Sequence, residues 1–399
     1  MKLCTRSSVL VPVLSIIMLA SGTVSAAQDN ADFEWPRLLV IGAAGTSSSS
    51  FAFTNGWAPV LQKQVGSVVR VVPEDNDSMR YRRLTERRDI TISSVSSADM
   101  RFQIEGIDGY AATRPAAQRV LWHGNDTPWG FVTSGDSKLQ SLEDLKKGGY
   151  RVAKGVFAPA MVTAVADALP AFIGLSDADA KKALSYVPVS SYAENCRSVV
   201  EGKADVAYCS PVSSVLSEME GAPGGIRWLP MNQDNQEGWA QYLKHRPMVT
   251  PSKMEMGVSS ARGVEGSTSN FVYAVPADTD EEFAYQMAKW FHQSYDTYKG
   301  THPLAARMSL EQFRLYLDRS PLPVHEGTVK YLREIGAWSE QDDAWNEQAK
   351  NKMDQWVQAR QTAMTEAAKA GVKMDFQNQA FLDILNQHTR NLEGFKSRL

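Results

Sequence analysis

A strand, loop and helix pattern within residues 38–64 is the feature that most constrains the fold. A short apolar run at 38–41 stops at Gly42, and the loop that follows, 42–50, contains only small and hydroxyl residues. This combination is typical of a buried strand, a tight turn and an amphipathic helix. The apolar positions that recur at helical spacing are Phe53, Trp57, Val60 and Leu61.

The small-residue loop has two interpretations. Its backbone N–H groups and hydroxyls, at the positive end of a helix dipole, would hold a carboxylate or another anion. Alternatively, the serines only cap the helix and Gly45 only makes the turn, because the loop lacks the spacing of a phosphate-binding fingerprint. The stretch alone leaves both open.

Further alternation of strands and helices predicts a parallel sheet. Strands are expected at 68–73 and 89–95, with a helix at 79–88 between them. Ligands of such sheets bind beyond the carboxyl ends of the strands. Three polar clusters fall at these ends and predict a site there: 45–49, 75–78 and 93–97.

A second α/β unit follows, with strands expected at 120–122, 129–133, 150–153, 186–189 and 205–209. The polar stretch 123–128 is expected to be a loop between the first two. Residues 230–264 carry Pro247 and Pro251 and are expected to form an irregular insertion. Helices are then expected at 280–298, 310–317 and 327–335.

The first 26 residues are typical of a signal peptide. Lys2 and Arg6 precede an apolar core at 9–20, and small residues lead to a cleavage site near Ala26. We therefore expect export to the periplasm. Loss of this segment leaves 40 basic against 45 acidic residues, so no nucleic-acid partner is expected. Cys196 and Cys209 remain, and the sequence leaves open whether they form a disulfide.

Several motifs follow one another through residues 38–338, and the late ones are the most specific: Thr301-His302-Pro303-Leu304 and Leu322-Pro323-Val324-His325-Glu326-Gly327. Together and in this order, the motifs resemble those of the TAXI family of solute receptors for tripartite ATP-independent periplasmic (TRAP) transporters. The resemblance implies a two-lobed, type II-like periplasmic binding protein that closes around a small organic acid and delivers it to a membrane permease. Family ligands are glutamate-like or dicarboxylate-like, and the family has no catalytic step.

The candidate ligand-binding residues come from the resemblance for the predicted lobe 1 loops, and from predicted strand ends for the aromatic residues and Ser210. Departures from the family pattern occur at Ser97, where a glutamine is usual, and at 155–160, where Phe157 and Pro159 replace a hydroxyl-rich loop. A more aromatic pocket with a less charged ligand is therefore expected. The predicted contacts are Gly45, Thr46, Ser47, Ser48, Ser49, Ser78, Ser97, Trp122, Phe157, Tyr192 and Ser210. Trp129 and Tyr208 also stand at predicted strand ends.

The expected organisation has four parts. Residues 1–26 are the signal peptide, 34–120 with 265–338 form lobe 1, 121–264 form lobe 2 with its insertion near 231–264, and 339–399 form a helical C-terminal extension. The nearest basic residues to the predicted site are Arg80 and Arg101, although Arg80 also suits a solvated helix face.

No metal site, cofactor or enzyme activity is expected, because the six histidines are scattered and none has metal-ligand spacing. The expected partners are the ligand and TRAP permease subunits, for a protein that acts as a monomer. Two alternatives stay open. The chain could be a binding protein that docks on a membrane receptor as a sensor, or a periplasmic hydrolase that uses Ser49.

Overall fold

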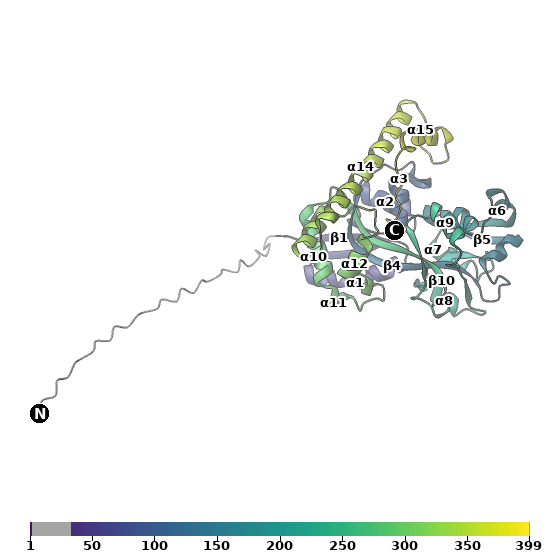
Figure 1. Cartoon of the computed structure of the whole chain (residues 1–399), viewed down its shortest axis with the longest axis horizontal. Helices are drawn as coiled ribbons and strands as arrows, with labels where there is room; N and C mark the ends of the chain where they lie inside the picture. Colours follow the sequence, from purple (N-terminus) through teal and green to yellow (C-terminus); the bar gives the residue numbers. More distant parts are fainter. Residues whose placement is uncertain (2–32, 399) are drawn as a thin grey trace. The chain divides into compact units, whose positions relative to one another are not determined.

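The main sheet is formed by strands that lie far apart in the sequence. The computed structural model describes Met1 and residues 33–398, and within them eight strands pair in the order β2-β1-β3-β10-β4-β7, with β8 on β4 and β9 on β10 (Figure 1). β5 and β6 form a separate parallel pair. The strands are β1 (Leu38–Ala43), β2 (Val68–Pro73), β3 (Ile92–Ser96), β4 (Gln118–Ser134), β5 (Tyr150–Gly155), β6 (Leu184–Val189), β7 (Ala207–Cys209), β8 (Ile226–Leu229), β9 (Val249–Lys253) and β10 (Glu265–Pro276).

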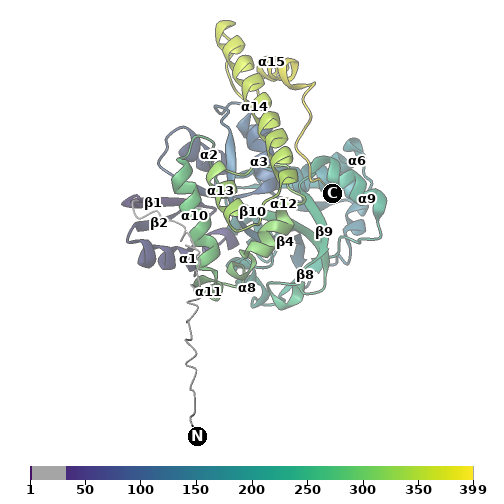
Figure 2. The ribbon, with the colours of Figure 1, turned by 60° about the vertical axis from the view of Figure 1, so that its left-hand side comes forward.

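Helices cover the main sheet and the β5–β6 pair, and the last two helices of the chain extend away from the main sheet (Figures 1 and 2). They are α1 (Ser49–Val65), α2 (Asp77–Thr85), α3 (Ser97–Glu105), α4 (Pro159–Thr163), α5 (Leu169–Phe172), α6 (Asp177–Ala183), α7 (Tyr192–Arg197), α8 (Ser214–Glu220), α9 (Gln236–His245), α10 (Glu281–Gln293), α11 (Tyr295–Tyr298), α12 (Leu310–Leu317), α13 (Glu326–Glu334), α14 (Glu340–Lys369) and α15 (Gln379–Thr389).

The parallel arrangement predicted for the start of the chain is confirmed. β1 pairs in parallel with β2 on one side and with β3 on the other. α1, α2 and α3 each begin within a few residues of the carboxyl end of the preceding strand. The three polar clusters therefore lie at one edge of the sheet, where ligands of parallel sheets bind.

The expected loop at 123–128 is wrong, because β4 runs through it as one continuous strand paired with β10. The titratable side chains that suggested a loop, His123 and Asp126, find partners inside the protein. Asp126 accepts hydrogen bonds from Arg307 at 2.9 Å and Arg319 at 3.3 Å. Burial alone would raise the pKa of Asp126, but hydrogen bonds from His123 and Arg307 outweigh it and hold this pKa below its usual range.

The irregular insertion expected near 231–264 is also partly wrong, since this stretch contains α9 and β9. Pro247 follows the end of α9, where no helical N–H is needed. Pro251 lies on β9, which pairs only with β10 among the described strands, and proline is tolerated on such an edge strand. The stretch packs into lobe 2 through Trp239, Tyr242 and Val249.

Two expectations about the start of the chain and its boundaries stay predictions. The predicted signal peptide falls almost entirely outside the described residues. Residues 34–120 with 265–338 are called lobe 1 below, and residues 121–264 are called lobe 2.

No single helix among the described residues has the length and apolar character to cross a membrane. A pair of helices bent by 107°, Pro159–Phe172 and Asp177–Ala183, meets the criterion by composition and length only.

The C-terminal extension is helical, as expected. Ser339 and Asp342 form a capping box that begins α14, and the 30-residue helix packs against α15 through Ala363, Ala367 and Phe381. Figure 2 shows the chain returning from α15 along α14.

Arg360 fastens this extension to lobe 1. Its side chain is completely buried and donates four hydrogen bonds to backbone carbonyls, at 2.6 Å to Gln103, 3.1 Å to Ile104, 2.6 Å to Tyr110 and 3.0 Å to Thr113. Gly106 permits the approach, because a β-carbon there would lie 2.4 Å from Arg360 Nε. Burial lowers the pKa of Arg360 to about 10, so the guanidinium stays charged near neutral pH.

We expect Arg360→Ala to lower the free energy of unfolding by about 3 kcal/mol, because buried carbonyls lose their donors. Chemical denaturation measures the change. Gln361→Ala, at an exposed position of the same helix, is the control and should shift stability by less than about 0.5 kcal/mol. Equal effects of the two substitutions would contradict the anchoring role of Arg360.

Candidate functional site

A small cavity lies where lobe 1 faces lobe 2. It has a volume of about 60 Å³, and its walls come from the loops after β1, β2 and β3, from α4 and α7, and from the long strands β4 and β10. The edge of the sheet that the sequence singles out therefore forms one wall of the cavity. Lobe 2 forms the opposite wall.

Serine residues and helix starts line the polar side. Ser48 caps α1, and its Oγ accepts a hydrogen bond of 3.2 Å from the N–H of Phe51. The next residues, Ser49 and Ser50, occupy the first turn of a 17-residue helix, whose N–H groups have no intrahelical acceptor. The helix dipole makes this end of the cavity favourable for an anion. The lining serines are Ser48, Ser49, Ser50, Ser96, Ser213 and Ser269.

A buried ion pair forms the floor on the lobe 1 side. Arg80, only 3% exposed, donates to the carboxylate of Asp77 through Nη2 and to the carbonyl of Glu74 at 2.5 Å. Asp75 accepts a hydrogen bond of 2.8 Å from the N–H of Gly45. A β-carbon at Gly45 would lie 2.2 Å from Asp75 Oδ1, so glycine is needed for this close approach.

Two further titratable residues, Asp99 and Arg246, face the cavity, and neither is in a carboxylate–guanidinium ion pair among the described residues. Asp99 is 8% exposed, and its Oδ1 has no hydrogen-bond partner among the described residues. Burial raises the pKa of Asp99 to about 8; nearby Asp77 adds to this effect, while Arg80 and Arg246 oppose it. Near neutral pH the Asp99 carboxyl therefore carries a proton and can donate a hydrogen bond.

Arg246 is the basic residue that lobe 2 contributes to the cavity lining. It is 5% exposed, donates through Nη1 to the carbonyl of Ala160 and lies 5.7 Å from the centre of the Tyr208 ring. Within the part of the chain that the structure describes, no carboxylate lies within ion-pair distance of Arg246 and its Nε has no acceptor. With Asp99 protonated, Asp75 and Asp77 balance Arg80 and Arg246, so the lining is close to neutral overall.

Aromatic side chains form the rest of the wall, as the sequence predicts. Trp129 stacks on Tyr208 with ring centres 5.2 Å apart, and Tyr192 meets Trp129 edge-on at 6.1 Å. The Tyr192 hydroxyl lies 3.0 Å from Ser213 Oγ and accepts from the N–H of Ser210 at 2.9 Å. The lining aromatic residues are Trp129, Phe157, Tyr192, Tyr208 and Phe271.

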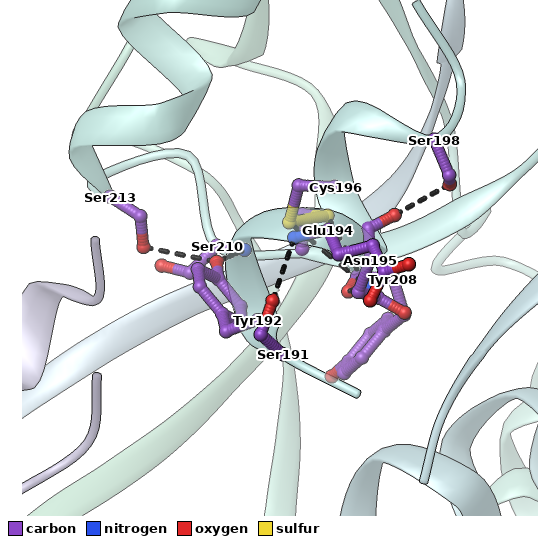
Figure 3. The surroundings of a disulfide bond; sticks show 10 residues. Ser191, Tyr192, Glu194, Asn195, Cys196, Ser198, Tyr208, Ser210 and Ser213 are labelled. Carbon is purple, nitrogen blue, oxygen red and sulfur yellow. Dashed lines mark hydrogen bonds between the residues drawn. A yellow bond between two sulfur atoms is a disulfide. The ribbon is translucent and has the colours of Figure 1, made fainter. Parts of the chain in front are cut away.

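A disulfide holds this aromatic wall from behind (Figure 3). Cys196 on α7 and Cys209 on β7 are bonded, with their Cα atoms 6.0 Å apart. α7 also carries Tyr192 and β7 carries Tyr208, so the bond ties together the two elements that supply these rings. Asn195 adds a hydrogen bond of 3.0 Å to the carbonyl of Tyr208.

The two lobes are in direct contact around the cavity. The N–H of Asp77 donates to the carbonyl of Phe157 at 3.2 Å, and Ser214 Oγ donates to the carbonyl of Ser47 at 3.3 Å. Ala160 of lobe 2 packs in one apolar cluster with Phe102 and Tyr110 of lobe 1. Each of these contacts would be lost if the lobes moved apart.

Four of the predicted contact residues line the cavity, namely Ser48, Ser49, Phe157 and Tyr192. The others lie elsewhere. Gly45 serves the Asp75 contact, Thr46 is exposed, and Ser47 meets lobe 2 through its carbonyl.

Buried or distant positions explain the remaining differences. Ser78 lines a separate groove, and Ser97 turns away from the cavity to bond Tyr316 at 3.0 Å. Trp122 is fully buried on β4, where it donates to the carbonyl of Met308 at 2.9 Å. Ser210 does not line the cavity, and its N–H donates to the Tyr192 hydroxyl.

Several lining residues are missing from the predicted contacts, among them Ser213, Ser269, Phe271 and Arg246. Arg246 lies in the polar stretch between α9 and β9, and a single arginine there carries no pattern that separates it from surface arginines. Arg80 is buried at the site and does not belong to a solvated helix face. Arg101 pairs with Glu105 instead of lining the cavity.

The cavity has the chemistry of a binding site. No histidine lines it, so Ser49 has no imidazole base there. Among the described residues, no group of three or more His, Cys, Asp and Glu side chains is placed to hold a metal ion. A polar anion seat faces an aromatic wall and a buried arginine across the two lobes.

This fold and site define a two-lobed solute-binding protein, a class without a catalytic step. The chain belongs to the NMT1-like family, whose model matches residues 41–336. A comparison with curated protein sequences finds no match.

Several solved structures are similar to the chain at low identity. A periplasmic transporter structure is 13% identical over 85% of this chain and 98% of its own, with a TM-score of 0.48. R. palustris Rpa4515 with adipate is 13% identical over 81% and 98%, with a TM-score of 0.46. The substrate binding protein of an amino acid ABC transporter is 10% identical over 68% and 98%, with a TM-score of 0.39.

We expect the Cys196→Ala, Cys209→Ala double variant to lose about 3 kcal/mol of unfolding free energy, because the bond closes a short loop of the unfolded chain. Denaturant titration measures the loss. Reduced wild-type protein is the matched control and should lose a similar amount. Indistinguishable oxidised and reduced wild-type curves would contradict the disulfide.

We expect Asp99→Asn to remove one component of the pH dependence of stability. Because the folded pKa is about 8 and the unfolded pKa is near 3.8, the wild type gives up stability as pH rises between these values. Asparagine does not titrate, so the variant should gain on the ligand-free wild type from about pH 5 to about pH 8. A stability difference that stays constant over this range would contradict a buried, protonated Asp99.

Proposed function

We propose that this protein captures a small organic acid between its lobes and delivers it to a membrane permease of the TRAP type. The observation that carries the proposal is the buried Arg246, which faces the cavity without a carboxylate partner among the described residues. A guanidinium in such a place suits a ligand carboxylate, because it offers charge-assisted hydrogen bonds.

The ligand acid group would lie between Arg246 and the start of α1. Both features favour negative charge, and they stand on opposite lobes, so a bound carboxylate would draw the lobes together. Protonated Asp99 and the lining serines supply neutral hydrogen-bond donors beside them. The small volume, about 60 Å³, favours a ligand with few heavy atoms.

The body of the ligand would meet the aromatic wall. Trp129, Tyr208 and Phe157 present apolar surface, and only Arg246 adds positive charge from lobe 2. This supports a glutamate-like or dicarboxylate-like acid with an apolar segment, or an aromatic acid. Closure would then be the step that selects the ligand, because the contacts from lobe 2 form only when the cleft is shut.

The cellular setting follows from the sequence. An exported chain, cleaved near Ala26, would work in the periplasm as a monomer beside the TRAP permease subunits. The resemblance of residues 38–338 to the TAXI receptors supports this assignment, and the family model that matches residues 41–336 is compatible with it.

A thermal-shift screen of the protein from Ala27 tests the ligand class. The compounds are dicarboxylates, amino acids, keto acids and aromatic acids. A ligand that binds only the native state raises the melting temperature. We expect the largest shift from a compound with at least one carboxylate, and a shift only with uncharged compounds would contradict the proposal.

Arg246→Ala should raise the Kd of that ligand roughly 30-fold, which corresponds to about 2 kcal/mol for charge-assisted hydrogen bonds. Isothermal titration calorimetry measures it. Lys244→Ala, at an exposed position of α9, is the matched control and should bind like the wild type. Arg246→Lys keeps the charge and should fall between the two. Equal affinity of wild type and Arg246→Ala would contradict the proposed role.

A further inference from the structure

The last residues of the chain, which lie beyond the stretch that the family model matches, make a connection between the lobes. The family model ends at residue 336, and both α14 and α15 lie beyond it. The segment 393–398, which follows α15, is here named the C-terminal strap. We propose that the C-terminal strap positions Arg246 for the ligand and holds the two lobes together around the closed cleft. This proposal deepens the proposed solute-binding function and rests on it.

The strap is firmly attached on the lobe 1 side. The N–H of Arg398 donates to the carbonyl of Arg319 at 2.9 Å, and its guanidinium donates to the carbonyl of Leu317 at 2.7 Å and lies 4.4 Å from the centre of the Trp345 ring. Phe395 is 1% exposed, and Lys352 of α14 lies over its ring at 5.0 Å.

From this anchorage the strap reaches lobe 2 directly beside Arg246. The N–H of Ser397 donates to the carbonyl of Pro247 at 3.0 Å. Figure 2 shows the chain descending from α15 to its end near α12, α9 and β9. The residue that follows Arg246 is therefore held by a donor that belongs to the lobe 1 side.

A second route grips the residue that precedes Arg246. The N–H of Phe395 donates to Glu105 at 2.6 Å, and Glu105 pairs with Arg101 at 3.1 Å. Arg101 in turn donates to the carbonyl of His245 at 3.3 Å. The carbonyls on both sides of Arg246 are thus bound from outside lobe 2. The strap binds the carbonyl of Pro247 directly, and Arg101 of α3 binds the carbonyl of His245.

This geometry adds a non-covalent tie to the strands that join the lobes. Under the predicted boundaries, the chain passes between the lobes within β4 and just before β10. Most strap contacts are with lobe 1 and α14, so opening of the cleft would break the few bonds at His245 and Pro247. The strap therefore favours the closed state, and ligand affinity rises with the population of that state.

Ser397 offers a matched pair of variants for the test. Ser397→Pro removes the N–H that bonds Pro247, whereas Ser397→Ala keeps it and loses only the hydroxyl bond to Arg319. We expect Ser397→Pro to raise the Kd of the ligand found in the screen about fivefold, the effect of one or two ordinary hydrogen bonds on an equilibrium. Ser397→Ala should stay within twofold of the wild type.

A distance measurement tests the strap without any ligand. Spin labels at Lys63→Cys in lobe 1 and Lys181→Cys in lobe 2, both exposed, report the separation of the lobes. We expect Ser397→Pro to shift the distances toward longer values, and Ser397→Ala to match the wild type.

The outcomes separate the strap from the ligand assignment. If the screen finds no ligand, the distances alone decide, and a shift specific to Ser397→Pro supports the strap. If Ser397→Pro lowers only the melting temperature, with distances and Kd unchanged, its role is merely structural and the proposal is overturned.

Discussion

The antiparallel pairing of β4 with β10 is the interaction on which the rest of the structure depends. The two strands pair from Gln118 with Pro276 to Trp129 with Ser267, and β4 then continues to pair β7 and β8. One continuous ladder thus runs from the sheet of lobe 1 into lobe 2. It sets where the lobes meet, and it brings Trp129, Ser269 and Phe271 to the cavity. The pairing satisfies the backbone of both strands but not their polar side chains. A charged side chain is therefore buried there beside tertiary partners, as Asp126 is beside Arg307 and Arg319.

Charge is arranged in the cavity by burial and not by the number of acids and bases. Three aspartates and two arginines line it, which by composition alone would disfavour an acidic ligand. Asp77 is neutralised by Arg80, and burial keeps a proton on Asp99 near neutral pH. Asp75 and Arg246 then balance each other, so the lining is close to neutral overall although it carries more acidic than basic side chains. The same desolvation makes each pairing costly to disturb.

The C-terminal extension enlarges the family fold without adding a wall to the cavity. α14 is anchored by Arg360, which binds carbonyls at the end of α3 and beyond it, and the start of α3 brings Asp99 to the cavity. The segment after α15 then returns to the backbone beside Arg246. An element outside residues 41–336 is thereby connected to both sides of the site.

Local patterns in the sequence determined the strands and helices at the start of the chain and the edge of the sheet where the cavity lies. Leu38–Ile41 followed by a hydroxyl loop, the apolar run 68–73 and the stripe on α10 are short-range signals that tertiary contacts did not change. Ser48, Ser49, Phe157 and Tyr192 were predicted because each follows a strand end or caps a helix.

Only the tertiary structure decided which polar residues face the cavity. Residues 123–128 look like a loop until β10 is placed beside them, and Trp122 looks available until α10 and α12 cover it through Phe291 and Phe313. Arg246 is placed by contacts with elements distant along the chain, such as Ala160 of α4, and the pairing of Cys196 with Cys209 depends on how α7 packs against β7. Burial and partner geometry are properties of the packed chain, and no local pattern encodes them.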